Sequence, residues 1–150
     1  MYRQIVERKI RALFEAVNNG DAEQVIAGFA RRFEHSFAGS HALGGSRHSA
    51  GATRLWYERM YRLLPDIRFM IERISVRGMP WNTVAIVEWQ ETNSATDGVR
   101  TTARGIHVVW IRWGKMVRLL IVPETHVLCA TLERIAAKGI SEARAEQITD

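Results

Sequence analysis

The chain has 150 residues, of which 47% are hydrophobic and 25% charged, and a formal net charge of +5 at pH 7. This length is that of one domain, no apolar run approaches the ~20 residues of a membrane span, and the N-terminus is a charged amphipathic segment and not a signal peptide. The single cysteine, Cys129, excludes an internal disulfide, so we expect one cytoplasmic domain with no membrane partner.

Helical periodicity dominates the first part of the chain. Apolar residues at three- and four-residue spacing predict a first helix over residues 3–18. A second helix is predicted to start at Asp21, with an apolar face that extends to Phe29 and Phe33. A short strand over residues 34–39 is then expected to follow it.

A glycine-rich loop over residues 40–46 leads to a third predicted helix. Ser46 or Ser49 can cap this helix, and Pro65 ends it because proline disfavours the helical conformation in the residue before it. The loop has no Lys-Ser/Thr ending and follows no apolar strand, so it is not a phosphate-binding loop.

The second half of the chain predicts strands. Alternating apolar residues and β-branched or aromatic runs mark them, and Asp-Gly marks a hairpin turn. The predicted strands cover residues 67–76, 81–92, 101–113 and 116–122, and a final helix starts at Glu124-Thr125 and ends at Gly139.

Helices followed by strands are typical of an α+β domain with an antiparallel sheet. We assign residues 1–138 to this domain and residues 139–150 to a polar, loosely held C-terminal tail. Both faces of the last strand are apolar, so one side of the sheet is expected to pack on the helices and the other on a partner chain. This pattern predicts a homodimer through the outer face of the sheet.

This order of elements and several short segments resemble the SnoaL-like branch of the nuclear-transport-factor-2-like superfamily. The segments are residues 37–39, 41–45, 78–83, 105–109 and 114–115. The resemblance implies a cone-shaped, curved antiparallel or mixed sheet packed on three N-terminal helices plus a C-terminal helix, with a pocket inside the cone. It does not imply one reaction, because the superfamily includes isomerases, cyclases, dehydratases, epoxide hydrolases and proteins without known activity.

Period-two alternation predicts which strand residues face the pocket. His107 shares its face with Ala103 and Gly105, small residues that leave room for a ligand. The resemblance suggests that Glu88 and Gln90 also point inward. His35 and Phe37 fall at inward positions of the first strand. If the register slips by one residue, Trp89 and Glu91 replace Glu88 and Gln90.

Catalytic residues known in the superfamily do not carry over. The positions of the limonene epoxide hydrolase relay hold Glu88, Gln90 and Ile121 here, and Phe14 lies near the position of the ketosteroid isomerase tyrosine. The resemblance therefore assigns no reaction.

A histidine and a carboxylate in a dry pocket can form a general acid/base pair. Our candidates are His107 with Glu88, His35 as a second histidine, and Gln90 as a positioning group. The predicted pocket wall contains Phe14, Phe37, Trp56, Ala103 and Gly105.

Our first hypothesis is an isomerase, cyclase or dehydratase that acts on a small apolar, ring-containing molecule without a cofactor. The histidines show no metal-ligand spacing, so no metal is expected. The second hypothesis is a non-catalytic ligand-binding or dimerisation module with the same cavity. The basic residues are scattered over several elements, so the sequence does not favour a nucleic-acid partner; steeply salt-dependent binding would indicate one.

Overall fold

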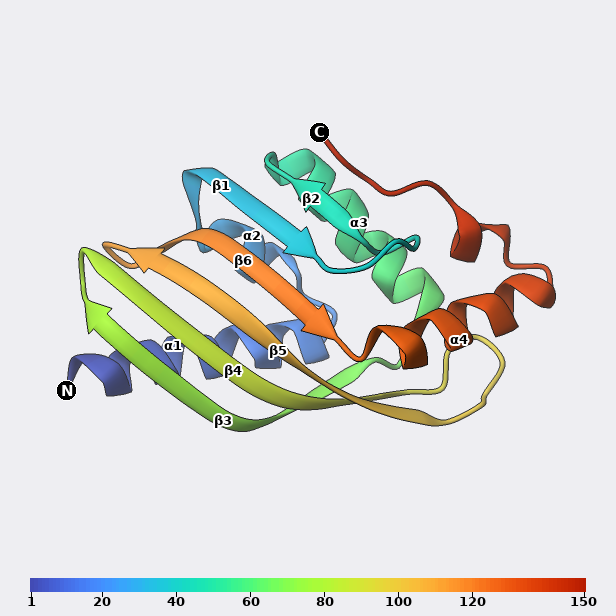
Figure 1. The fold of residues 1–150 in the computed structure, drawn as a ribbon. Helices are drawn as coiled ribbons and strands as arrows, with labels where there is room; N and C mark the ends of the chain where they lie inside the picture. The colour runs from blue at the N-terminus through green and yellow to red at the C-terminus, as the bar shows by residue number, and fades with distance from the viewer.

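In the computed structural model, which describes residues 1–150, a curved six-stranded sheet lies against the helices (Figure 1). The strand order is β2-β1-β6-β5-β4-β3, and only the β1–β6 pair is parallel. The α+β fold and its mixed sheet confirm the prediction. The elements in chain order are α1 (Tyr2–Asn18), α2 (Glu23–Ala27), β1 (Phe29–Phe37), β2 (Gly45–Arg47), α3 (Ala50–Leu63), β3 (Arg68–Met79), β4 (Asn82–Asn93), β5 (Thr101–Arg112), β6 (Lys115–Pro123), α4 (Thr125–Ala137) and the 3-10 helix η1 (Ser141–Arg144).

Three irregularities in strand pairing accompany the curvature of the sheet. The register shifts between Phe29 and Glu34 on β1, across Glu72 on β3, and between Trp110 and Ile111 on β5. An extra residue in one strand bends that strand and increases its twist. The sheet therefore has a concave inner face, and the helices cover it.

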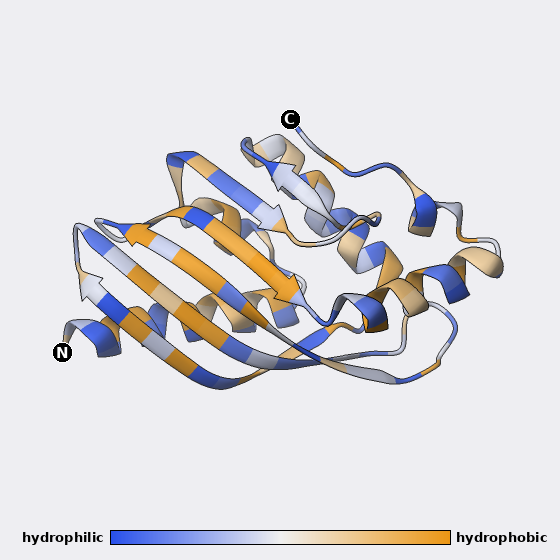
Figure 2. Ribbon diagram, in the orientation of Figure 1, coloured by the Kyte–Doolittle hydropathy of each residue, from blue (hydrophilic) through white to orange (hydrophobic).

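The amphipathic helices α1 and α3 line the inside of the cone. Val6, Ile10 and Phe14 form the buried stripe of α1, while Trp56 and Met60 belong to that of α3. The Ser49 side chain caps α3 by accepting a hydrogen bond from the Ala52 N–H at 3.1 Å. The second half of β6 is an unbroken apolar run (Figure 2). No helix combines the length and the hydropathy that a bilayer crossing requires.

The boundary between the second helix and the first strand differs from the prediction. Helix α2 ends at Ala27, and Phe29 and Phe33 lie on strand β1 with their rings stacked at 4.2 Å between centroids. A four-residue spacing keeps side chains on one face of a helix, but it also keeps them on one face of a strand. The pattern therefore could not distinguish the two, and pairing with β6 decided for the strand.

The C-terminal tail is held against the domain, so the prediction of a loose tail is wrong. The Ile148 carbonyl accepts a hydrogen bond from the buried guanidinium of Arg47 at 2.9 Å. The Glu146 carbonyl accepts one from Arg59 at 2.7 Å, and Gln147 donates one to the Gly39 carbonyl at 3.0 Å. These contacts join the tail to α3 and to the loop before β2.

Candidate functional site

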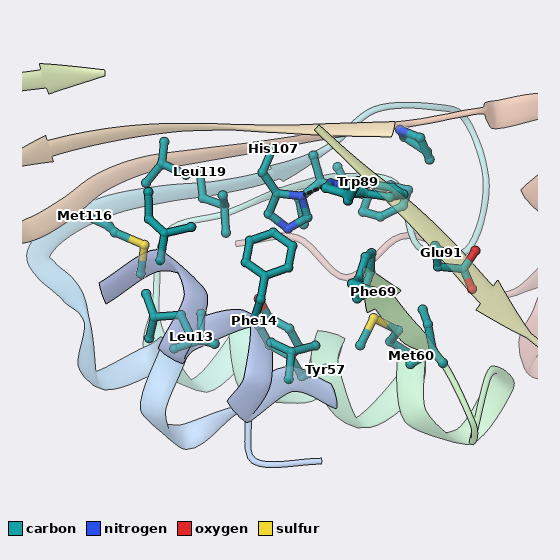
Figure 3. A pocket seen from close by; sticks show the side chains of 18 of the residues that line it. Leu13, Phe14, Tyr57, Met60, Phe69, Trp89, Glu91, His107, Met116 and Leu119 are labelled. Carbon is teal, nitrogen blue, oxygen red and sulfur yellow. Dashed lines mark hydrogen bonds between the residues drawn. The ribbon is translucent and has the colours of Figure 1, made fainter. Parts of the chain in front are cut away.

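A cavity of about 380 Å³ lies between the concave face of the sheet and the helices (Figure 3). Of the 37 residues that line it, 26 are hydrophobic, so its wall suits an apolar guest. The few polar groups on this wall determine what chemistry it can support.

His107 lies in the middle of β5, opposite Val87 on β4. The indole Nε1–H of Trp89 donates a hydrogen bond to its Nδ1 at 2.7 Å, and the Phe14 ring packs 4.8 Å from the imidazole between centroids. Because Nδ1 accepts a proton donor, the neutral ring carries its own hydrogen on Nε2. This second nitrogen is directed into the cavity (Figure 3).

The protonation of His107 follows from its burial. Desolvation lowers its pKa to about 3, so the ring is neutral near neutral pH. A neutral ring with Nδ1 occupied is a hydrogen-bond donor through Nε2 and not a base. Of the general acid/base role predicted for His107, this geometry favours hydrogen-bond donation through Nε2.

Glu91 is the only acidic residue on β4 that faces the cavity. It lies opposite Phe69 on β3 and Ala103 on β5, and its side chain is only 8% exposed. Asn93 Nδ2 donates a hydrogen bond to its Oε1 at 2.7 Å. Burial raises the pKa of Glu91 to about 7, which allows this carboxyl to bind and release a proton near neutral pH.

Tyr57 adds a third polar group from the helical side of the cavity. The residue is buried on α3 and lies behind Phe14 in the close view (Figure 3). Its hydroxyl makes no hydrogen bond within the protein, and burial raises its pKa above the ordinary range. Tyr57 is therefore a neutral hydrogen-bond donor or acceptor that is available to a ligand.

The predicted inward positions on β4 are wrong by one residue. Val87 pairs with His107, so Trp89 and Glu91 share the inner face, while Glu88 and Gln90 point outward. Glu88 forms an ion pair with Arg73 on the outer face, with 2.7 Å between Oε2 and Nε. The proposed His107–Glu88 pair therefore does not exist.

His35 points inward but lies behind the cavity wall. It is fully buried, and the rings of Trp56 and Tyr57 pack on it at 4.6 and 5.4 Å. Arg47 Nε donates a hydrogen bond to its Nδ1 at 3.1 Å, which leaves Nε2 without a partner. Burial lowers the pKa of His35 well below its ordinary value, so the ring is neutral, and its contribution is to packing.

The other predicted pocket residues divide into two groups. Phe14, Phe37, Trp56 and Ala103 line the cavity, as expected. Gly105 does not provide room for a ligand, because a methyl group at this position would be 2.3 Å from the Trp89 indole. Its role is to admit the tryptophan that orients His107.

Tyr57 is not among the residues that the sequence pattern predicts for the site, and Glu91 is predicted only as the consequence of a register slip. The sequence did contain a signal for Glu91. Arg73 and Glu88 have opposite charges and lie on neighbouring predicted strands, as expected of an ion pair on the exposed face of a sheet. Pairing these two on the outer face would have placed Glu91 inside. In the structure, no group of three or more histidine, cysteine or acidic side chains is arranged to hold a metal ion.

Comparisons with known proteins support the fold. The model of the SnoaL-like domain family matches residues 10–119, so the chain belongs to this family. No curated protein is similar in sequence.

Solved structures share the NTF2-like fold at low sequence identity. PrhC from Penicillium brasilianum superposes with a TM-score of 0.79 at 13% identity, over 95% of this chain and 94% of its own. TerC, co-crystallised with polyporic acid, has a TM-score of 0.74 at 18% identity, over 84% and 96%. An NTF2-like protein of unknown function from Burkholderia pseudomallei has a TM-score of 0.71 at 17% identity, over 87% and 94%.

Proposed function

We propose that the protein binds a small, largely apolar, ring-containing molecule in the cavity and transfers a proton on it. One observation carries this proposal: a buried carboxyl with a pKa of about 7 and a neutral imidazole donor face the same apolar cavity. Two titratable groups whose environments drive their protonation in different directions are typical of an acid/base site.

In the proposed reaction, the Glu91 carboxylate removes a proton from carbon. The negative charge that develops moves to a carbonyl oxygen of the substrate, where His107 Nε2–H or the Tyr57 hydroxyl donates a hydrogen bond to it. Returning the proton to a different carbon isomerises the substrate. If Glu91 gives the proton to a hydroxyl group that leaves as water, the reaction is a dehydration; if the carbanion attacks an internal carbonyl, whose oxygen then takes the proton, the reaction is a cyclisation.

The spacing of these groups favours a conjugated ring system. Glu91 lies opposite Ala103, four positions along β5 from His107, which is about 13 Å of strand. The two groups therefore act on separate atoms of one ligand. When a proton is removed at one atom, a conjugated system carries the negative charge to an oxygen at the other.

The experiment follows deuterium exchange from heavy water into a panel of tetralones and conjugated cyclic enones by NMR. Exchange reports proton removal even where no net product forms. We expect Glu91→Gln to slow exchange by about 100-fold or more, since a positioned general base contributes at least this much. Glu88→Gln on the outer face is the matched control and should leave the rate unchanged. Equal rates for the two variants would contradict the role of Glu91.

A non-catalytic ligand-binding module is the second candidate. It is favoured by the hydrogen bonds that the polar groups receive from their own neighbours, from Trp89 to His107 and from Asn93 to Glu91. Binding of an apolar fluorescent naphthylamine in the cavity, together with no exchange above background for any ketone of the panel, would support the module over the enzyme.

We also propose that two copies pair through the outer face of the sheet. Exposed or half-buried apolar side chains occupy this face of four neighbouring strands, and no other part of the chain covers them. They are Met70, Val84, Ile86, Ile106, Val108, Trp110, Leu120 and Val122. A contiguous apolar face of this kind is typical of a protein interface.

A further inference from the structure

The acidic and the basic residues of the cavity wall lie at different ends of the cavity. The acids are Glu91 and Glu124, and the cations are Lys9 and Lys115. Glu91 lies near the end of β4, whereas Lys115 starts β6 at the opposite end of the sheet. Eight residues of β4 separate Glu91 from Thr83, the residue level with the start of β6, which corresponds to about 25 Å of strand. The cavity therefore has one basic end and one acidic end.

The basic end of the cavity is open. Here the lining residues Ile5, Lys9 and Ala12 are exposed and follow one face of α1. They oppose the exposed turn Gly114-Lys115 between β5 and β6. Around His107 and Tyr57, by contrast, the wall is buried. A ligand that enters between α1 and this turn passes the lysines first.

The two ammonium groups lie on the same rim. A methyl group built on Gly114 would be 3.4 Å from Lys9 Nζ, so the Lys9 ammonium lies over this turn. Lys115 Nζ donates one hydrogen bond, to the Ala27 carbonyl at 3.1 Å, next to the lining residue Gly28. Neither lysine is in an ion pair.

The Glu91 carboxyl does not cancel this positive charge. The two ends are separated by several times the screening length of about 8 Å at physiological ionic strength. Burial also keeps Glu91 partly protonated near neutral pH. The charge of Glu91 therefore has little effect at the rim where Lys9 and Lys115 lie.

We infer that the ligand of this cavity is an amphipathic anion, whose rings lie against Phe14 and His107 and whose carboxylate, sulfonate or similar group lies between Lys9 and Lys115. This inference rests on the proposed small-molecule function and narrows the class of ligand. A neutral molecule of the same shape would fill the apolar wall but leave both ammonium groups without a partner.

A matched pair of fluorescent probes tests the inference. Anilinonaphthalenesulfonate is anionic, and phenylnaphthylamine has the same rings without the sulfonate. We expect the sulfonate to bind about tenfold more tightly at low salt, because two partly exposed ion pairs contribute this much together. The preference should decline as salt is added. The two probes should displace each other, as expected for one cavity.

The decisive variant is Lys9→Met with Lys115→Met. It should reduce sulfonate binding to the level of phenylnaphthylamine and leave phenylnaphthylamine binding unchanged. Arg8→Met with Arg11→Met is the matched control, since it removes two charges from exposed positions of α1 that do not line the cavity, and it should keep the preference. Thermal unfolding of each variant shows that the fold is intact.

The possible failures separate the two proposals. Phenylnaphthylamine binding without a sulfonate preference in the unaltered protein, or a preference that survives the double lysine change, would overturn the anionic ligand and leave the apolar cavity intact. Probes that do not compete would overturn it as well. If neither probe binds, the proposed small-molecule function fails and the inference fails with it.

Discussion

At the scale of single residues, burial determines which groups of the site carry a proton near neutral pH. Trp89 fixes the tautomer of His107, Gly105 admits the Trp89 ring, and Asn93 holds one oxygen of Glu91. Desolvation then shifts the two pKa values apart, to about 3 for His107 and about 7 for Glu91. Trp89 and Asn93 line the cavity themselves, whereas Gly105 lies behind the Trp89 ring.

The raised pKa of Glu91 predicts a specific pH dependence of stability. Because the folded protein binds this proton more tightly than the unfolded chain, the free energy of unfolding falls as pH rises from about 4.5 to about 7 and stays reduced above that range. Glu91→Gln removes this loss. At pH 8 the variant should be more stable than the unaltered protein by about 3 kcal/mol at most, and near pH 4.5 the two should be nearly equal.

Urea unfolding at several pH values measures this difference. The contributions of His35 and His107, whose lowered pKa values reduce stability as pH falls below about 6.5, are common to both proteins and cancel. Glu88→Gln serves as the control because Glu88 is on the outer face. Parallel stability curves for Glu91→Gln and the unaltered protein would show that the Glu91 carboxyl is not desolvated.

At the scale of elements, short-range patterns predicted the type of most helices and strands correctly. They failed for segments whose structure is decided by contacts with distant parts of the chain. Helices α1 and α3 and the β4–β5 hairpin have strong periodicity or turn residues of their own. Strand β1 was predicted as helix in its first half, because Phe29 and Phe33 fit both periodicities and only the parallel partner β6 selects the strand. The C-terminal tail is polar in sequence, yet its backbone carbonyls are the partners that a buried arginine needs.

Deletion of residues 146–150 is expected to destabilise the protein. Arg47 is fully buried without a carboxylate partner, and its guanidinium is satisfied by the carbonyls of Gly44, Gly45 and Ile148 and by His35. Losing the Ile148 carbonyl leaves part of a buried charge unpaired, which costs about 2 to 3 kcal/mol.

Chemical unfolding of the truncated protein checks this expectation. Arg47→Met combined with the deletion is the informative control, because it removes the charge that requires the tail, so the deletion should then cost less than in the unaltered protein. An equal cost in both backgrounds would show that the tail acts through other contacts.

At the scale of the whole molecule, the apolar outer face of the sheet predicts a dimer. Ile86 is 40% exposed in the single chain and lies near the middle of this face, opposite Val108 on β5 and Ser75 on β3. Ile86→Asp would bury an unpaired charge in the interface, which is strongly unfavourable. We expect sedimentation at micromolar concentration to show a dimer for the unaltered protein and a monomer for the variant.

Leu55→Asp on α3 is the control for this prediction. Leu55 is 54% exposed and lies on a helix, away from the sheet face. Its substitution should leave the dimer intact. A monomeric unaltered protein would contradict the proposed interface.

The sequence by itself determined the class of fold, the extent of α1, the β4–β5 hairpin and a small part of the apolar cavity wall, because these depend on local periodicity, on turn residues and on the segments that resemble the family. Only the tertiary structure decided which face of β4 points inward, since moving a strand by one position exchanges its two faces and local patterns resist that shift weakly. It also decided where the cations lie. Lys9 and Lys115 are far apart in sequence, and they lie near one rim because the packing of α1 places Lys9 over the turn that precedes β6.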